Sequence, residues 1–317
     1  MALQFILGPS GAGKSEYIYE DIIRRTMQDE RENVIVLVPE QYSLEIQRKL
    51  VQKHPRGGSF QIDVIGFNRL AYRIFDELHI KPKKVLEDFG KSMLLRKAAQ
   101  EHKEELSLYA GSLDKAGFID EAKSLMSEIY QYDIPRERLR EALQKLDDSE
   151  EARVLARKLQ DMLVIFDAFE EKKGQSFIVA EQMLELLTAA AEQSELIAGS
   201  EIVLDGFTGF TPIQLNLISV LLRRAKKVTI VLTIDAATYE KKHVAEHELF
   251  ALTKQTIEHL LLTAEQAHVV VEPALFLGKD GCKRWSKGHP LAHLEQNLFR
   301  YPYRVGKDEE QAITITA

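Results

Sequence analysis

The sequence predicts an α/β protein: a parallel sheet that carries a phosphate-binding loop, with an all-helical lobe inserted into it. Three observations predict this fold. An apolar run, Leu3–Leu7, leads directly into the glycine-rich segment GPSGAGKS at residues 8–15. Short β-rich runs alternate with helical periodicity near the start of the chain and return towards its end, which is typical of a parallel sheet. The long stretch between them has helical periodicity throughout.

The first strands are expected at three apolar runs, Leu3–Leu7, Val34–Val38 and Gln61–Ile65. Two segments with apolar residues at helical spacing, Tyr17–Gln28 and Ser43–Gln52, separate these runs and are expected to be helices. Alternation of strand and helix favours parallel pairing, because parallel strands need a long crossover connection that is usually a helix.

The helical block covers residues 85–198, where apolar side chains recur every three or four positions. Strand-like runs then return at Ile202–Leu204, Val228–Leu232 and Val269–Glu272. Strands that are distant in sequence can pair within one sheet. We therefore expect one sheet domain built from residues 1–84 and 199–317, with residues 85–198 inserted as a helical domain.

The glycine-rich segment fills every fixed position of the pattern Gly-x-x-x-x-Gly-Lys-Ser, which binds the phosphates of nucleoside triphosphates. It consists of Gly8, Pro9, Ser10, Gly11, Ala12, Gly13, Lys14 and Ser15. Backbone N–H groups of such a loop and of the helix that follows point at one spot, where the helix dipole favours negative charge. We expect Lys14 to contact the outer phosphates of ATP and the Ser15 hydroxyl to be a Mg²⁺ ligand. The alternative is a glycine-rich turn without a ligand.

An apolar run that ends in aspartate, Ile202–Asp205, is the arrangement by which P-loop proteins place a carboxylate beside Mg²⁺. We expect Asp205 to support the metal of the nucleotide, the alternative being that it begins a turn. In a translocating ATPase the next residue is normally a glutamate that orients the attacking water. Here it is Gly206, which predicts that ATP is bound but hydrolysed slowly.

Three further segments lie where predicted strands end, which is the usual ligand-facing edge of an open α/β sheet. They are Val38–Ser43, Ile65–Arg73 and Asp205–Gln214. They combine aromatic rings with amide, hydroxyl and guanidinium groups, from Phe67, Tyr72, Phe207, Phe210, Gln41, Ser43, Asn68, Arg69 and Arg73. Rings stack on bases and arginine or glutamine contacts base edges or phosphates, so the mixture suits single-stranded nucleic acid. The alternative is core aromatic residues with polar surface caps.

Composition favours a cytoplasmic protein that does not hold nucleic acid over its whole surface. The formal net charge is −7, and residues 1–84 carry 13 Lys and Arg against 11 Asp and Glu, whereas the remainder carries 29 against 38. No apolar run reaches the roughly 18 residues of a membrane span. The single cysteine, Cys282, excludes an internal disulfide and is expected to be an inert thiol. His289 and His293, with Glu295, have the spacing of a metal pair, but Pro290 fits a helix start better.

Several short motifs follow one another along almost the whole chain. They are the P-loop, VPEQ, FNRLAYR, LDGFTGFTP, ELF at Glu248–Phe250 and HPLAHLE at His289–Glu295. The ordered set resembles the N-terminal part of the AddB (RexB-like) family, subunits of the AddAB ATP-dependent helicase/nuclease that processes double-strand DNA ends. The resemblance implies a RecA-like, superfamily 1 helicase-like fold. In it, residues 1–84 and 199–317 are a 1A-like P-loop NTPase domain and residues 85–198 a 1B-like domain.

The resemblance also implies a role. An AddA-like helicase/nuclease subunit is the expected partner in a heterodimer, DNA ends and single-stranded DNA are the expected substrates, and no membrane is involved. This helicase half is expected to have lost motor function and to recognise a Chi-type recombination hotspot in single-stranded DNA. Gly206, where a motor has a glutamate, agrees with that loss.

By matching motif positions, the resemblance assigns recognition of the hotspot to Gln41, Ser43, Phe67, Arg69, Tyr72 and Phe210. Ser43 stands where the family pattern has threonine and Tyr72 where it has tryptophan, and both keep the chemical type of the side chain. The nuclease domain and the four-cysteine 4Fe–4S cluster of the family are not found in these residues. We therefore expect neither motor nor nuclease activity. The strand-like run Ala312–Thr316 at the end suggests the front part of a longer protein.

Two other functions fit parts of the pattern. A P-loop kinase of a small molecule would use the helical block as a lid, but it needs arginines that converge on the transferred phosphoryl group. Kinase lids are also usually much shorter than this block of roughly 110 residues. The other possibility is a scaffold whose nucleotide site is structural.

Overall fold

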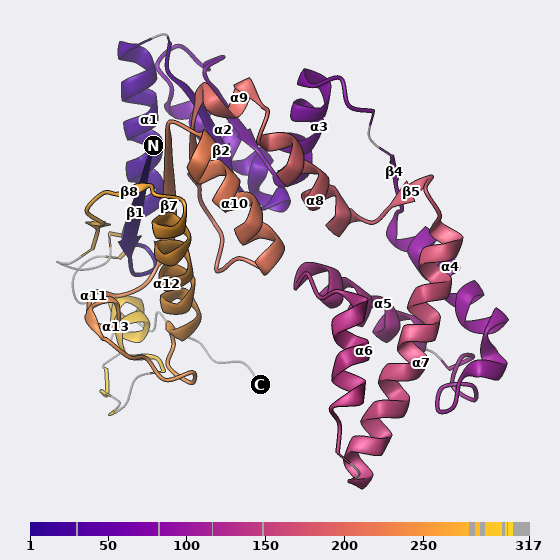
Figure 1. Cartoon of the computed structure of the whole chain (residues 1–317). Helices are drawn as coiled ribbons and strands as arrows, with labels where there is room; N and C mark the ends of the chain where they lie inside the picture. The colour runs from indigo at the N-terminus through magenta and orange to yellow at the C-terminus, as the bar shows by residue number, and fades with distance from the viewer. Residues whose placement is uncertain are drawn as a thin grey trace. The chain divides into compact units, whose positions relative to one another are not determined.

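The computed structural model of the protein describes residues 1–29, 31–81, 83–115, 117–147, 149–278, 283–285, 289–299, 302 and 304–306. The chain folds as two compact units (Figure 1). Unit 1 comprises residues 1–70, 194–210 and 218–317, and unit 2 comprises residues 71–193 and 211–217. Whether these units correspond to 1A-like and 1B-like helicase domains stays a prediction.

Unit 1 is built on a parallel sheet with the strand order β3-β2-β6-β7-β1-β8, and β9 pairs with β1. Its strands are β1 (Ala2–Gly8), β2 (Asn33–Leu37), β3 (Ile62–Ile65), β6 (Ser200–Leu204), β7 (Lys227–Thr233), β8 (Val270–Val271) and β9 (Leu275–Phe276). Each pairing in this sheet among the described residues is parallel. The predicted α/β class with a parallel sheet is therefore confirmed, and strands from both ends of the chain share one sheet.

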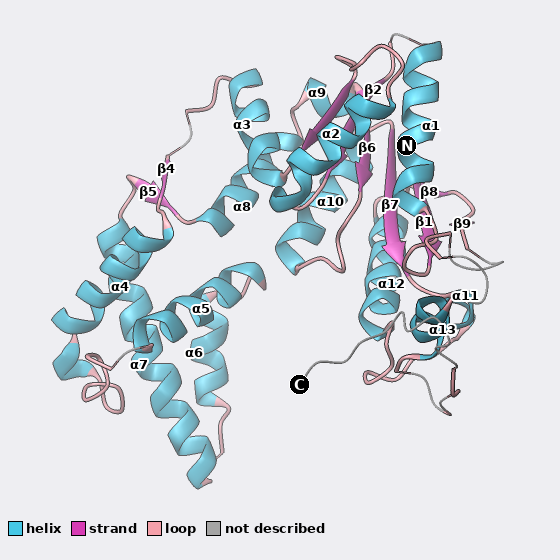
Figure 2. Cartoon of the chain, turned by 180° about the vertical axis from the view of Figure 1, so that it is seen from behind, coloured by secondary structure: helices cyan, strands magenta, loops and turns pink. Residues whose placement is uncertain are grey.

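Helices cover both faces of this sheet (Figures 1 and 2). The helices that belong wholly or partly to unit 1 are α1 (Lys14–Gln28), α2 (Ser43–Lys53), α3 (Phe67–Glu77), α9 (Glu195–Ala198), α10 (Pro212–Arg224), α11 (Ala236–Glu240), α12 (Ala251–Gln266) and α13 (Pro290–Asn297), with a 3₁₀ turn at Glu40–Tyr42. On one face, Ile22 of α1 and Ile46 of α2 pack with strand residues such as Val36 and Val203. Alternate residues of these strands are buried on the opposite face, because successive side chains of a strand point to opposite sides.

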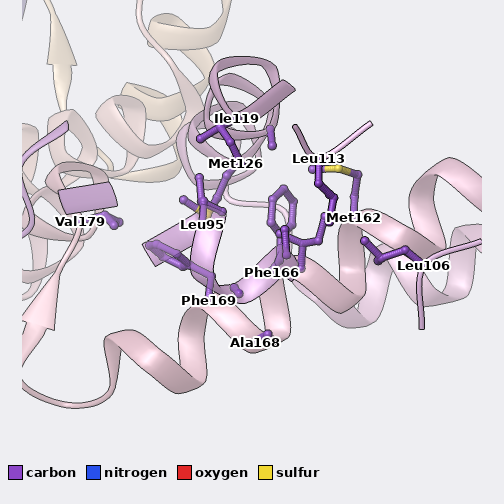
Figure 3. Packing of buried hydrophobic residues seen from close by; sticks show 14 residues of the cluster. Leu95, Leu106, Leu113, Ile119, Met126, Met162, Phe166, Ala168, Phe169 and Val179 are labelled. Carbon is purple, nitrogen blue, oxygen red and sulfur yellow. The ribbon is translucent and has the colours of Figure 1, made fainter. Parts of the chain in front are cut away.

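Unit 2 is mainly helical and has its own core. Its helices are α4 (Asp88–Glu101), α5 (Phe118–Gln131), α6 (Arg136–Gln144), α7 (Glu150–Lys173) and α8 (Ala180–Ala191), with a 3₁₀ turn at Lys103–Glu105. Figure 3 shows how Phe166 and Phe169 of α7 pack with Leu95, Met126 and Ile119 from α4 and α5. In α4, α5 and α7 the apolar residues that recur at helical spacing thus lie on the buried face of the helix.

Unit 2 also holds a pair of strands that the sequence analysis did not predict. The block from residue 85 onwards was expected to be helical throughout, but β4 (Lys84–Val85) and β5 (Phe177–Ile178) pair in parallel. Strands of two residues are too short to show alternation, and their pairing joins positions far apart in the chain, so no local pattern reveals them.

Candidate functional site

The carboxyl ends of the parallel strands form one edge of the unit 1 sheet, which we call the rim. The strand order places the segments after β3, β2 and β6 next to one another, while β7 separates β6 from β1. We divide the rim into two halves. The P-loop half is formed by residues 8–15, Tyr19, Asp205 and Lys283. The aromatic half is formed by residues 40–43, 66–69 and 207–210. One residue predicted for the site, Tyr72, belongs to unit 2 instead.

Lys14 is held by the backbone of its own loop. The loop joins the end of β1 to the start of α1. The Lys14 Nζ atom donates hydrogen bonds to the carbonyl oxygens of Gly8 and Pro9, each at 2.9 Å. The ammonium therefore lies across the loop, beside the N-terminus of a 15-residue helix. Such a terminus, with its unpaired N–H groups and dipole, favours an anionic group, and Lys14 adds a full positive charge.

Asp205 lies directly after β6 and is buried, with 4% of its surface exposed. Its Oδ2 atom accepts a hydrogen bond of 2.6 Å from the hydroxyl of Tyr19, a residue of α1 that is equally buried. Its Oδ1 atom accepts a hydrogen bond of 2.9 Å from the backbone N–H of Gly206. Both carboxylate oxygens thus accept hydrogen bonds from protein donors, so a metal-bound water at Asp205 would compete with the Tyr19 hydroxyl for Oδ2.

Tyr19 links the two residues that the sequence predicted as metal ligands. Burial raises the pKa of the Tyr19 hydroxyl strongly, and the charge of Asp205 and the hydrogen bond to it raise this pKa further. A hydrogen bond with Ser15 acts in the opposite direction on the same pKa. Tyr19 therefore stays protonated and acts as a hydrogen-bond donor. No sequence motif marks Tyr19, although its position four residues after Ser15 places both residues on one face of α1.

Gly206 has a backbone conformation that disfavours a side chain. Its φ angle is +83°, in the left-handed region that glycine adopts readily and other residues do not. A Cβ atom placed there would lie 3.3 Å from Cδ of Pro39. A side chain at the position where a motor ATPase carries its glutamate is therefore strained by the backbone angle and crowded by Pro39 of the VPEQ segment.

Lys283 lies beside the P-loop although it is distant in sequence. The backbone N–H groups of Lys283 and Arg284 donate to the carbonyl oxygen of Gly11 at 3.0 and 3.2 Å. A Cβ atom placed on Gly13 would be 3.1 Å from Cδ and 3.8 Å from Nζ of Lys283. The positive charge of Lys283 contributes, after the larger effect of Lys53, to lowering the pKa of Glu16. No motif marked this lysine, because only the fold brings it to the loop.

In the aromatic half, three phenylalanine rings form a continuous row. The ring centroids of Phe67 and Phe207 are 5.5 Å apart, and those of Phe207 and Phe210 are 5.2 Å apart. Phe67 begins α3, and the other two follow β6. All three rings are half-buried. The structure thus joins two of the residues predicted to contact DNA through a third, Phe207, which the sequence assigned to the segment but not to the site.

Glu40 connects the VPEQ segment to the segment after β3. Its Oε1 atom accepts a hydrogen bond of 3.0 Å from the backbone N–H of Asn68, in the first turn of α3. The carboxylate comes so close to Gly66 that a Cβ atom there would lie 2.2 Å from Cδ of Glu40. Glycine at position 66 therefore permits this contact, and the contact fixes the start of α3 relative to the end of β2.

The polar residues predicted to contact DNA differ in how they are placed. Gln41 and Arg69 are exposed. Ser43 is half-buried, and its hydroxyl donates a hydrogen bond of 2.9 Å to the carbonyl oxygen of Glu40. Tyr72 is 45% exposed and lies three positions after Arg69 on α3. Gln41 and Arg69 can thus reach a ligand directly, whereas the Ser43 hydroxyl already donates its proton to the carbonyl oxygen of Glu40.

The histidine pair belongs to a helix start. The Nδ1 atom of His289 accepts a hydrogen bond of 3.1 Å from the backbone N–H of Leu291, and Pro290 begins α13. The Nε2 atom of His293 lies 2.9 Å from the carbonyl oxygen of Arg304. Among the described residues, no group of three or more histidine, cysteine, aspartate or glutamate side chains could hold a metal ion. Cys282 and Ala312–Thr316 lie outside the described residues.

Within the part of the chain that the structure describes, none of the helices is both long enough and apolar enough to cross a bilayer.

Comparison with known proteins gives one consistent result. A family model described as "ADDB, N-terminal" matches residues 5–295. A relative from Lachnoclostridium phytofermentans, named as the B subunit of an ATP-dependent helicase/deoxyribonuclease, is 38% identical over 321 aligned residues, which cover 100% of this chain and 28% of the relative. A relative of the same name from Clostridium kluyveri is 33% identical over 316 residues, covering 99% of this chain and 27% of the relative. This chain therefore spans less than a third of the length of these relatives.

Proposed function

Because this chain belongs to the AddB N-terminal family, we propose that it is the N-terminal part of the B subunit of an ATP-dependent helicase/deoxyribonuclease. This enzyme processes double-strand DNA ends for recombinational repair in the cytoplasm, as a heterodimer with an AddA-like helicase/nuclease subunit. Residues 1–84 and 199–317 act as a RecA-like, 1A-like P-loop NTPase domain, and residues 85–198 as a 1B-like domain. The P-loop half of the rim binds ATP, and the aromatic half binds a single DNA strand.

The P-loop half supplies the groups that a triphosphate needs. Lys14 is positioned by two carbonyl oxygens of the loop, and a charge-assisted contact from such an ammonium is stronger than a neutral hydrogen bond. Backbone N–H groups at the start of α1 are suited to the phosphate oxygens. When Mg²⁺ accompanies the nucleotide, Ser15 is the loop hydroxyl suited to contact this ion.

The observation that carries the proposal of binding without turnover is the backbone at Gly206. Hydrolysis requires a residue that orients the attacking water in line with the γ-phosphate. The position after Asp205 has a φ angle of +83° and a neighbouring Pro39 that leaves little room for a side chain. The chain thus keeps the phosphate-binding groups while lacking the catalytic carboxylate, which supports a bound nucleotide that controls conformation rather than driving a motor.

The aromatic half supports recognition of a strand in which bases are unpaired. The row formed by Phe67, Phe207 and Phe210 offers rings for base stacking. Exposed Gln41 and Arg69 can form hydrogen bonds with base edges, and this adds selectivity for a Chi-type sequence. Ser43 and Tyr72 complete the proposed set of recognition residues.

The test is made on the full-length heterodimer with DNA that carries its hotspot sequence, by measuring hotspot-dependent protection of the DNA strand from degradation. Arg69→Ala and Gln41→Ala should each weaken binding by about 1–3 kcal/mol, and only on DNA with the preferred bases. Arg48→Ala and Gln52→Ala serve as matched controls, because both residues are exposed on α2 outside the rim. If the Arg69 and Gln41 variants protected the hotspot as well as the controls, base recognition by the aromatic half would be wrong.

A further inference from the structure

Tyr19 lies between Ser15 and Asp205 in the P-loop half. It follows Ser15 by one helical turn, and its hydroxyl donates a hydrogen bond of 2.6 Å to Oδ2 of Asp205. Both partners are 4% exposed, and the remaining Asp205 oxygen is bonded to the N–H of Gly206. A neutral phenol therefore sits between the hydroxyl and the carboxylate that P-loop proteins use around Mg²⁺.

This arrangement conflicts with a metal shell of the usual kind. Mg²⁺ demands nearly octahedral geometry and keeps several of its water molecules, and the carboxylate after the strand normally binds the ion or accepts a hydrogen bond from one of those waters. In this protein the Tyr19 hydroxyl already provides that hydrogen bond.

The loop has another source of positive charge. Lys283 is fixed beside it by the bond from its backbone N–H to the carbonyl oxygen of Gly11. Its Nζ atom would be 3.8 Å from a Cβ atom on Gly13. Together with Lys14, it places two ammonium groups near the N-terminus of α1. Two cations at this position can compensate part of the phosphate charge that a divalent ion neutralises elsewhere.

We propose that Tyr19 replaces a metal-bound water as the hydrogen-bond donor to Asp205, so that nucleotide binding at this P-loop depends little on Mg²⁺. The inference rests on the proposed function, because it requires that the loop binds ATP. It goes beyond that function by assigning Tyr19 a positioning role: the phenol withdraws Asp205 from the metal. A nucleotide site with this property holds its ligand without the ion that hydrolysis requires.

The experiment measures the dissociation constant of a fluorescent ATP analogue, once with excess Mg²⁺ and once with excess EDTA. For the parent protein, the two constants should agree within about threefold. In Tyr19→Phe the ring is kept and the hydroxyl is lost, so Asp205 becomes available to the ion. The variant should bind at least about tenfold more tightly with Mg²⁺ than with EDTA, the scale of one charge-assisted hydrogen bond.

Tyr17→Phe is the matched control, because Tyr17 lies on the same helix and is 41% exposed. It should behave like the parent protein. The inference is overturned if the parent already binds at least about tenfold more tightly with Mg²⁺, a result that needs no variant. It is also overturned if Tyr19→Phe folds like the parent, by its thermal unfolding curve, and shows the same ratio of constants. Absence of binding in both conditions by both proteins overturns the proposed ATP binding itself.

Discussion

The P-loop half and the aromatic half of the rim lie on the same sheet edge but use their side chains differently. In the P-loop half, Lys14, Tyr19 and Asp205 are hydrogen-bonded to groups of the protein, and Tyr19 and Asp205 are almost fully buried. In the aromatic half, Gln41 and Arg69 are exposed. This difference fits the proposed function, in which the P-loop half keeps a bound nucleotide and the aromatic half contacts a passing strand.

The two halves also differ in what catalysis and strand recognition would require of them. A motor needs a water-orienting carboxylate next to the nucleotide, and the left-handed backbone at Gly206 makes any side chain there strained. Recognition of a strand needs accessible rings and polar groups, and the segments after β3, β2 and β6 combine half-buried rings with exposed Gln41 and Arg69. We expect changes in the P-loop half to alter nucleotide binding alone, and changes in the aromatic half to alter DNA binding alone.

The largest expected effect is that of Lys14→Ala. Loss of the ammonium removes charge-assisted contacts with the phosphates and should weaken ATP binding by about 100-fold or more. Titration with a fluorescent ATP analogue measures this change. Lys49→Ala, which removes an exposed lysine of α2 paired with Glu45, is the control and should bind like the parent. Unchanged affinity in Lys14→Ala would show that the loop does not hold the phosphates.

The next effect concerns Gly206. Gly206→Ala should lower the free energy of unfolding by about 1–2 kcal/mol because the residue would keep a positive φ angle. Gly206→Glu should lower it by about 2–3 kcal/mol, since the longer side chain must also avoid Pro39. Urea unfolding measures both, and Gly111→Ala is the control at a glycine with open space around it. Rapid DNA-stimulated hydrolysis by Gly206→Glu would contradict the account, because it would show that the site needs only this side chain.

A third prediction tests the continuity of the aromatic row. Phe207→Ala should weaken single-strand binding by the full-length heterodimer by on the order of 1–3 kcal/mol on most sequences, because every base has a face to stack. Phe207 touches both neighbouring rings, so its loss should cost at least as much as Phe210→Ala. Phe60→Ala removes a fully exposed ring just before the amino end of β3 and should have no effect. Equal behaviour of the Phe207 and Phe60 variants would show that the row is only core packing.

The smallest effect is expected for Ser43→Ala. The Ser43 hydroxyl donates its proton to the carbonyl oxygen of Glu40, so removing it should lower stability by about 0.5–1.5 kcal/mol. Hotspot-dependent protection should change less than in Arg69→Ala. Ser43→Thr keeps the hydroxyl and should match the parent in both measurements. A loss of hotspot protection in Ser43→Ala as large as that in Arg69→Ala would place Ser43 in direct contact with bases.

Local patterns were sufficient to predict β1, β2, β3, β6, β7 and β8 and the helices α1 and α2 of unit 1, but not β9. A central strand such as β2 reads as a continuous apolar run because it is buried on both faces of a parallel sheet. The P-loop follows from a fixed spacing of residues, since its chemistry depends on consecutive backbone groups. The segments at strand ends could be predicted to share one edge for the same reason: parallel strands end on the same side.

The remaining features depend on contacts between distant positions. Tyr19 and Asp205 are 186 residues apart, and no pattern in either segment indicates that they meet. Lys283 reaches the loop only because β9 pairs with β1 and the chain then passes over Gly11. Glu40 and Gly66 lie in separate segments of the sequence. Only the fold shows that the Glu40 carboxylate comes so close to position 66 that a glycine is needed there. Such pairings are set by tertiary packing rather than by local preference.

The most direct test of the central claim is the chemical state of nucleotide retained by the protein. The chain is incubated with ATP labelled on both the base and the γ-phosphate, separated rapidly from free nucleotide and analysed over time with and without single-stranded DNA. The account predicts that labelled nucleotide stays with the protein as the triphosphate, with turnover far below the median enzyme rate of about ten per second. It would be contradicted if no nucleotide were retained, or if DNA caused rapid release of the labelled phosphate.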